Sequence, residues 1–121
     1  MQIPELPERL HGGKPMTRHA AAQALGRMGP LASTPEVLRA LTERLGDVED
    51  VRWAAAWALG RIGLAGVPPD VRSEILNSVL THLRHDDGDV RRAAAWALAR
   101  MSGATRPEVI EVLTDALLRG V

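Results

Sequence analysis

The segment Val51–Gly63, VRWAAAWALGRIG, places small and large apolar residues at the spacing of one helix face. Related segments occur at Val90–Ser102 (VRRAAAWALARMS) and at Thr17–Gly29 (TRHAAAQALGRMG). The three copies begin 34 and 39 residues apart. An internal repeat of this period is typical of a solenoid built from helix pairs, so it predicts an all-α fold.

The composition indicates a single domain with an aliphatic core. The chain has 121 residues, which is enough for one domain and too few for two ordinary ones. Hydrophobic residues make up 45% of the chain, many of them alanine, and there are three Trp but no Phe or Tyr. Because small side chains let helix axes approach, this core predicts closely packed helices.

Charge and cysteine content exclude several classes of protein. Fifteen basic and fifteen acidic residues give zero net charge, which argues against a globally basic nucleic-acid binder. The absence of cysteine excludes disulfides and Cys-ligated metals. No apolar run approaches the roughly 18 residues of a membrane span, and Met1–Leu10 lacks the apolar segment of a signal peptide. We therefore expect a cytoplasmic protein with no membrane partner.

Turn residues divide the chain into two kinds of helix that alternate. The alanine-rich copies predict helices, here called B helices, over residues 17–28, 51–62 and 90–101. Stripes of Leu, Val and Ile predict A helices over residues 35–45, 70–84 and 107–119. The expected fold is an α-solenoid (α-α superhelix) of about six helices, with roughly three HEAT-like repeats over 17–121 and an N-terminal arm or cap over 1–16.

Several polar residues are candidates for helix caps. Thr17 is the expected N-cap of the first B helix, and Asp50 and Asp89 are those of the other two. Ser33 and Glu36 have capping-box spacing at the start of the first A helix. The last A helix has no following helix to cover it, so homo-oligomerisation through this end helix is a hypothesis.

The central B helix divides into a core face and an outward face. Its core stripe is Val51, Ala54, Ala55, Ala58, Leu59 and Ile62. Its outward residues are expected to be Arg52, Trp53, Ala56, Trp57, Gly60 and Arg61. Stacking of the repeats would align equivalent outward residues of the three copies in rungs. The rungs are His19, Trp53 and Arg92; Gln23, Trp57 and Trp96; and Arg27, Arg61 and Arg100.

An acidic turn followed by Val-Arg-x-Ala-Ala-x-x-Ala-Leu-Gly-x-Ile-Gly, at residues 50–63 and in a variant form at 89–102, resembles the HEAT repeat. The resemblance is to the short bacterial subclass related to phycobilin lyases. It implies an α-solenoid whose B helices line a concave face, where ligands usually bind. The first copy departs from the pattern in Thr17 and in lacking an acidic turn, and the third ends in Ala-Arg-Met-Ser.

The nine residues of the rungs, here called the Trp/Arg ridge, are the candidate partner-binding site. Trp and Arg dominate binding hot spots, and large exposed apolar groups mark interfaces. The alternative is that the tryptophans wedge between neighbouring B helices and only complete the packing.

The arginines at positions 18, 52 and 91 recur in every copy. Because the planar guanidinium group suits carboxylates, we expect these arginines to bond the acidic turns as ladders between repeats. A stripe that binds phosphates is the alternative. The carboxylates of the turns are Asp47, Asp50, Asp87 and Asp89.

No metal site or catalytic site is expected. His82 and His85 precede the acidic run 86–89, but a metal site needs three or four convergent ligands, and histidines are common near helix ends. There is no cysteine nucleophile, G-x-S-x-G, Gly-rich phosphate loop or H-E-x-x-H. The His-Glu pairs of the iron-binding hydroxylases built on related repeats are also absent. We therefore expect a protein that is not an enzyme and has no cofactor.

Three functions fit the sequence. A protein interaction or scaffold module that binds a helix or an extended segment through the Trp/Arg ridge is favoured, by analogy with other solenoids. An accessory subunit or lyase-like chromophore partner would need a cofactor-sized cleft with an acid or a base. Nucleic-acid binding through the rung of Arg27, Arg61 and Arg100 and neighbouring arginines is the least favoured, because the net charge is zero and the acidic turns oppose it.

Overall fold

The structure is a computed structural model that describes residues 5–101 and residue 114. Within residues 5–101, six α-helices and two short 3₁₀-helices follow one another, and there is no strand. The elements are α1 (Glu5–Arg9), α2 (Pro15–Met28), η1 (Gly29–Ala32), α3 (Pro35–Glu43), η2 (Arg44–Gly46), α4 (Glu49–Ile62), α5 (Pro69–Leu83) and α6 (Gly88–Met101). The prediction of an all-α fold is confirmed.

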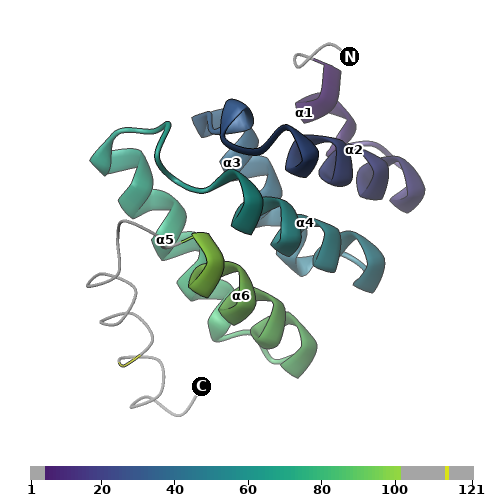
Figure 1. The fold of residues 1–121 in the computed structure, drawn as a ribbon. Helices are drawn as coiled ribbons and strands as arrows, with labels where there is room; N and C mark the ends of the chain where they lie inside the picture. The colour runs from purple at the N-terminus through teal and green to yellow at the C-terminus, as the bar shows by residue number, and fades with distance from the viewer. Residues whose placement is uncertain (1–4, 102–113, 115–121) are drawn as a thin grey trace.

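The helices form two layers, as the repeat predicts (Figure 1). The B helices α2, α4 and α6 run side by side, and the most extensive contacts between helices join α2 to α4 and α4 to α6. The A helices α3 and α5 contact each other, and they pack against α4 and α6 respectively. The surface of α2, α4 and α6 that is turned away from α3 and α5 is called the B face below. This arrangement is the predicted α-solenoid.

Apolar stripes of the A helices build the core against the B helices. Leu38 and Leu41 of α3 are fully buried, and so are Ile75 and Val79 of α5. These residues recur three and four positions apart, which places them on one side of each helix. The stripes predicted for both A helices are therefore confirmed, although Leu80 is only partly buried.

Alanines of the B helices let these helices pack closely, and α4 is more enclosed than predicted. Ala55 and Ala56 are completely buried, and Arg52 is 8% exposed. The expectation that Arg52 and Ala56 point outward is wrong, because α4 lies between α2 and α6 as well as against α3. A helix with neighbours on three sides keeps only a narrow exposed strip, to which Trp57 and Arg61 belong.

Three helix starts differ from the predictions. The helix α2 begins two residues before Thr17, and its Pro fits the first turn, where a missing N–H costs nothing. The helix α4 begins at Glu49, so Asp50 lies inside its first turn. Asp89 likewise lies inside α6, and its backbone N–H donates to the Asp87 carboxylate at 2.8 Å. Thr17, Asp50 and Asp89 are therefore not N-caps.

The first A helix is capped by the residue after the predicted one. The hydroxyl of Thr34 accepts the backbone N–H of Val37 at 3.3 Å, which makes Thr34 the N-cap of α3. Ser33 is instead buried; its hydroxyl donates to the Gly63 carbonyl and accepts the N–H of Gly66, both at 3.1 Å. Ser33 thus ties η1 to the connection between α4 and α5.

The ends of the chain bear differently on the predictions. Leu6 and Leu10 are buried, and α1 contacts α2 and α3, so this segment covers part of the first repeat. The division of the chain at residue 16 stays a prediction. The last predicted A helix lies outside the described residues, except for the helical and exposed Thr114, so self-association through it stays a hypothesis. None of the helices that the structure describes combines the length and the hydrophobicity that a membrane span requires.

Candidate partner-binding face

Two tryptophans of the Trp/Arg ridge carry an arginine over their rings. The Arg61 guanidinium carbon lies 5.8 Å from the ring centroid of Trp57, and that of Arg100 lies 4.5 Å from Trp96. Each pair is one helical turn apart, so the helix itself places the cation over the ring. Trp57 is 36% exposed, Trp96 is half-buried, and both arginines are exposed. The two pairs therefore present aromatic and cationic groups together on the B face.

The same tryptophans also pack against glycines of the preceding B helix. A Cβ atom added to Gly26 of α2 would overlap the six-membered ring of Trp57. A Cβ atom added to Gly60 of α4 would lie 3.4 Å from the Trp96 ring and 2.8 Å from Cβ of Arg100. Each indole thus fills a contact between repeats, as the packing alternative expects, and it also remains partly exposed, so the binding role stays a prediction.

The glycine contacts were not predicted from the sequence. The signal that could have revealed them is the glycine at the same place in the first two copies, three residues after Gln23 and after Trp57. The third copy has Ala99 there.

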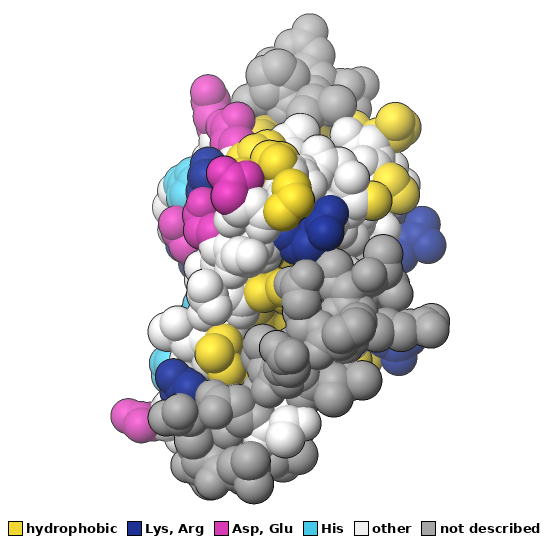
Figure 2. Space-filling view, turned by 90° about the vertical axis from the view of Figure 1, so that its left-hand side faces the viewer, with side chains coloured by type: hydrophobic (Ala, Val, Ile, Leu, Met, Phe, Trp, Pro, Cys, Tyr) yellow, Lys and Arg dark blue, Asp and Glu magenta, His cyan; other side chains and the backbone are white. Residues whose placement is uncertain are grey.

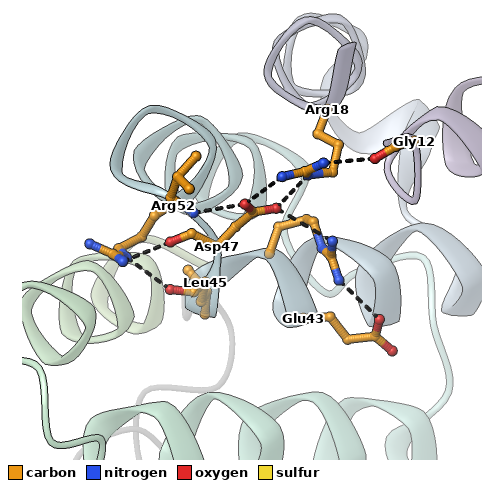
Figure 3. Close-up of polar contacts among 8 residues, drawn as sticks. Gly12, Arg18, Glu43, Leu45, Asp47 and Arg52 are labelled. Carbon is orange, nitrogen blue, oxygen red and sulfur yellow. Dashed lines mark hydrogen bonds and ion pairs between the residues drawn. The ribbon is translucent and has the colours of Figure 1, made fainter. Parts of the chain in front are cut away.

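The first contact of the ladder formed by the recurring arginines joins Arg18 of α2 to the acidic turn before α4 (Figure 3). Arg18 donates to both carboxylate oxygens of Asp47 at 2.7 and 2.9 Å, and to the Gly12 carbonyl at 2.7 Å. Asp47 also accepts the backbone N–H of Val48 at 2.7 Å and Arg44 at 3.4 Å. The bidentate geometry is the one that guanidinium and carboxylate groups favour.

The second contact of the arginine ladder joins α4 to α6. Arg52 donates to the backbone carbonyls of Leu45 and Asp47 at 3.1 and 2.7 Å, which Figure 3 shows, and to the Asp89 carboxylate at 2.5 Å. Asp89 also accepts the Trp53 indole N–H at 3.3 Å and Arg92 at 3.1 Å. The predicted contacts of Arg18 and Arg52 with the acidic turns are therefore confirmed.

The third arginine does not join two described repeats, and one of the predicted carboxylates takes no part in the ladder. Arg91 donates to the carbonyls of His85 and Asp86 at 2.7 and 2.9 Å, within its own turn. Asp50 was expected to take part, but its exposed side chain forms no hydrogen bond or ion pair with any described residue. The arginine that could have reached Asp50 bonds Asp47 instead.

The ladder shifts the pKa of its carboxylates. Hydrogen bonds from Arg18 hold the pKa of Asp47 below its ordinary value, with smaller contributions from the Val48 N–H and from Arg44, while burial opposes them. Hydrogen bonds from Arg92 and Arg52 lower the pKa of Asp89 in the same way. Because the charged form is the bonded form, both carboxylates remain ionised at neutral pH.

A groove of about 330 Å³ lies between α2 and α4 on the B face. It brings together four residues of the Trp/Arg ridge, namely His19 and Gln23 of α2 with Trp53 and Trp57 of α4. Its other side chains are those of Glu49, Asp50 and Ala54 of α4. The two carboxylates were not among the predicted site residues, because Asp50 was expected to cap α4 and to join the ladder, and Glu49 fell in the turn before the predicted helix.

The remaining ridge residues lie outside this groove. Arg27, Arg61 and Arg100 are exposed in the last turns of α2, α4 and α6. Arg92 is exposed and bonded to Asp89. Figure 2 views the molecule from the left of Figure 1, and Lys and Arg side chains lie beside hydrophobic ones toward its right-hand side, which is the side of the B helices.

The histidines of the second acidic turn make local bonds. Nδ1 of His82 lies 2.9 Å from the Ser78 carbonyl oxygen, one turn earlier in α5. Nδ1 of His85 accepts the backbone N–H of Asp87 at 3.0 Å. Within residues 5–101 and 114, no three His, Asp or Glu side chains converge as metal ligands would.

Comparison with solved structures supports the solenoid fold. An engineered protein, 22% identical, superposes with a TM-score of 0.62 over 96% of this chain, which spans about half (51%) of that protein's length. The complex of CpcE and CpcF of phycocyanin lyase from Nostoc sp. PCC7120 contains a chain that is 20% identical and superposes with a TM-score of 0.54. That match covers 96% of this chain and 88% of the other.

Sequence profiles identify the repeats directly. A profile of HEAT repeats matches residues 3–73, one of a HEAT-like repeat matches 49–101, and one of the PBS lyase HEAT-like repeat matches 90–119. No curated protein sequence matches the chain. The matched segments include all three alanine-rich copies, which confirms the resemblance drawn from them. Because the profile of HEAT repeats alone covers more than half of the chain, the protein belongs to the HEAT-repeat family.

Proposed function

We propose that the protein is a non-enzymatic interaction module that binds a helix or an extended segment of a protein partner on the B face. The exposure of Trp57 carries the proposal: this large indole is 36% exposed in a helix whose other apolar side chains are largely buried. Arg61 lies over its ring, and Trp and Arg are the residue types most enriched in binding hot spots.

The charges on the B face give a partner a defined orientation. Acidic residues lie in the first turns of α4 and α6, and exposed arginines lie in the last turns of all three B helices. A segment that is basic along one edge and acidic along the other complements this arrangement. Such complementarity sets the register and the association rate of a complex more than its affinity.

Photo-crosslinking in cells that produce the protein tests the proposal. A photoreactive amino acid at Arg61 or Arg100 should capture a defined protein, whereas the same group at Asn77, exposed on α5, should not. Equal crosslinking from both sides of the molecule would contradict a binding role for the B face.

Binding of the captured protein, once purified, then gives the energetic test. The exchange Arg61→Glu with Arg100→Glu should weaken binding by roughly 100-fold, since each hot-spot truncation costs about 1–2 kcal/mol or more. The control for the two added acids is Ser73→Glu with Asn77→Glu, which places two glutamates on exposed positions of α5 and should leave the affinity unchanged. These variants are preferable to Trp57→Ala, because the Trp57 ring also packs on Gly26.

A lyase-like accessory role is the second candidate. The observation in its favour is that the groove between α2 and α4 holds an imidazole, His19, and two carboxylates, Glu49 and Asp50, which could act as acid and base. A shift in the absorbance of an added bilin would support this role, and an unchanged spectrum would remove it.

A further inference from the structure

Asp50 and Asp89 occupy the same position in two successive repeats but have different surroundings. Each is the second residue of its B helix, two residues before the recurring arginine. Asp89 accepts hydrogen bonds from Arg52, Arg92 and Trp53. Its charge is therefore neutralised by two guanidinium groups of the chain itself.

At the first junction, the corresponding arginine is used elsewhere. Arg18 bonds Asp47 in a bidentate pair, at 2.7 and 2.9 Å, and does not reach Asp50. Asp50 and the neighbouring Glu49 are both exposed, and neither side chain forms a hydrogen bond or an ion pair with any described residue. Within the described part of the chain, Glu49 and Asp50 thus have no guanidinium partner, whereas Asp89 of the next repeat has two.

Both carboxylates line the groove between α2 and α4, next to Trp53 and Trp57. The Trp53 ring is held in place by its N–H, which donates to Asp89. The other polar side chains that line the groove are His19 and Gln23. The groove therefore combines indole surfaces, two negative charges and a side-chain amide in about 330 Å³, a size typical of ligand pockets.

We propose that this groove binds an arginine side chain of the protein partner. A guanidinium group is planar, stacks on indole rings and donates several hydrogen bonds to carboxylates at once. The chain already places guanidinium groups over indole rings, Arg61 over Trp57 and Arg100 over Trp96. This inference rests on the proposed function and adds to it the chemistry of the residue that the partner inserts.

Titration with N-acetyl-arginine methylamide, followed by NMR, tests the proposal. The chain has three Trp, so its three indole N–H signals can be assigned by single Trp→Phe exchanges. The signals of Trp53 and Trp57 should shift with a Kd on the order of 10 mM, as expected for one stacked cation, while that of Trp96 serves as an internal reference. The citrulline analogue, which has the same shape without the charge, should cause no shift at the same ionic strength.

The variant Glu49→Gln with Asp50→Asn should weaken binding of the arginine probe at least about tenfold. Its matched control is Glu36→Gln with Asp70→Asn, which neutralises first-turn acids of α3 and α5. Equal binding of the citrulline analogue, equal shifts at Trp96, or unchanged binding by the groove variant would each overturn the proposal. If Arg61→Glu with Arg100→Glu abolishes capture of the partner while the groove variant still captures it at full affinity, this inference fails and the proposed function stands.

Discussion

The junction of α2 with α4 and the junction of α4 with α6 are built from the same repeat motif but differ in the side-chain contacts between the helices. In the first, α2 contributes His19 and Gln23, and an open groove remains beside Trp53 and Trp57. In the second, α4 contributes those two indoles at the equivalent positions, and Trp53 bonds Asp89 across the junction. The two junctions thus differ in the pair of side chains that the preceding helix contributes, which is His19 and Gln23 in one and Trp53 and Trp57 in the other.

The arginine ladder differs between the two junctions in a parallel way. Arg18 bonds a carboxylate of the turn before α4, whereas Arg52 bonds a carboxylate inside the first turn of α6. The first choice leaves the acids of α4 available to a ligand, and the second uses the acid of α6 for structure. The comparison teaches that the same helical repeat can form either a stabilising contact or a candidate binding site, depending on which carboxylate its arginine bonds.

Removal of Arg52 should have the largest effect of any change at either junction. Its guanidinium is buried and donates to the carbonyls of Leu45 and Asp47 and to Asp89. Arg52→Ala removes this donor from the two carbonyls and leaves Asp89 with only Trp53 and Arg92, so the free energy of unfolding should fall by about 3 kcal/mol. Urea unfolding followed by circular dichroism measures this loss.

The comparison is sharpened by two further arginine variants. Arg18→Ala, at the first junction, should cause a smaller loss than Arg52→Ala, because Arg18 is less buried. Arg92→Ala removes an exposed partner of Asp89 and should change stability by less than about 0.5 kcal/mol. Equal losses for Arg52→Ala and Arg92→Ala would show that burial of Arg52 is not what stabilises the second junction.

The glycines at the two junctions should respond differently to the same exchange. In Gly26→Ala the new methyl group overlaps the Trp57 ring, so stability should fall by about 1–2 kcal/mol despite the better helix propensity of alanine. In the background of Trp57→Ala the overlap with the ring is absent, but the new Cβ atom still lies 3.1 Å from the Ala58 Cα atom. The same exchange should then cost less than about 0.5 kcal/mol, because only this backbone contact opposes the better helix propensity of alanine. Urea unfolding of the four variants in this cycle shows how much of the loss disappears.

At the second junction, removal of the indole should not restore the stability lost by the glycine exchange. The Cβ atom added to Gly60 would lie 2.8 Å from Cβ of Arg100, which is fixed to the α6 backbone, and only 3.4 Å from the Trp96 ring. Gly60→Ala should therefore destabilise both with and without Trp96→Ala. A rescue by Trp96→Ala equal to that by Trp57→Ala would mean that indoles alone set the spacing of the B helices.

The order of the helices could be predicted because the repeat determines it locally. Alanine-rich and leucine-rich helical periods alternate along the chain, and prolines and glycines mark their ends. The pairing of Arg18 and Arg52 with acidic turns was also predictable, since a recurring arginine beside recurring carboxylates has few other partners. These inferences depend only on spacing along the chain and on the chemistry of the side chains.

Burial and the choice between neighbouring carboxylates could not be predicted in the same way. Arg52 and Ala56 are buried because α4 has a B helix on each side, which a pattern within one helix does not reveal. Arg18 bonds Asp47 because the 3₁₀-helix η2 and the start of α4 at Glu49 determine where that turn lies. The groove acids follow from this choice, so the sequence indicated the indoles of the site but not its carboxylates.

Acid should weaken both junctions, with a smaller effect than the changes above. The pKa values of Asp47 and Asp89 lie below the ordinary value of 3.8 in the folded protein, because the ladder arginines bond the charged forms. Their contribution to stability is therefore complete at neutral pH and is lost as the pH falls below about 4 and through the folded pKa values. Asp47→Asn should cost about 1 kcal/mol at pH 7 and cause a shallower loss of stability below pH 4.

The equivalent residue of the second turn, Asp86, supplies the control for this experiment. Its side chain is exposed, and Asp86→Asn should leave the dependence of the urea midpoint on pH parallel to that of the unmodified protein. If Asp47→Asn and Asp86→Asn give the same curve, the Arg18–Asp47 pair does not stabilise the folded state. Arg18 would then be free to serve Asp50, and the distinction between the two junctions would disappear.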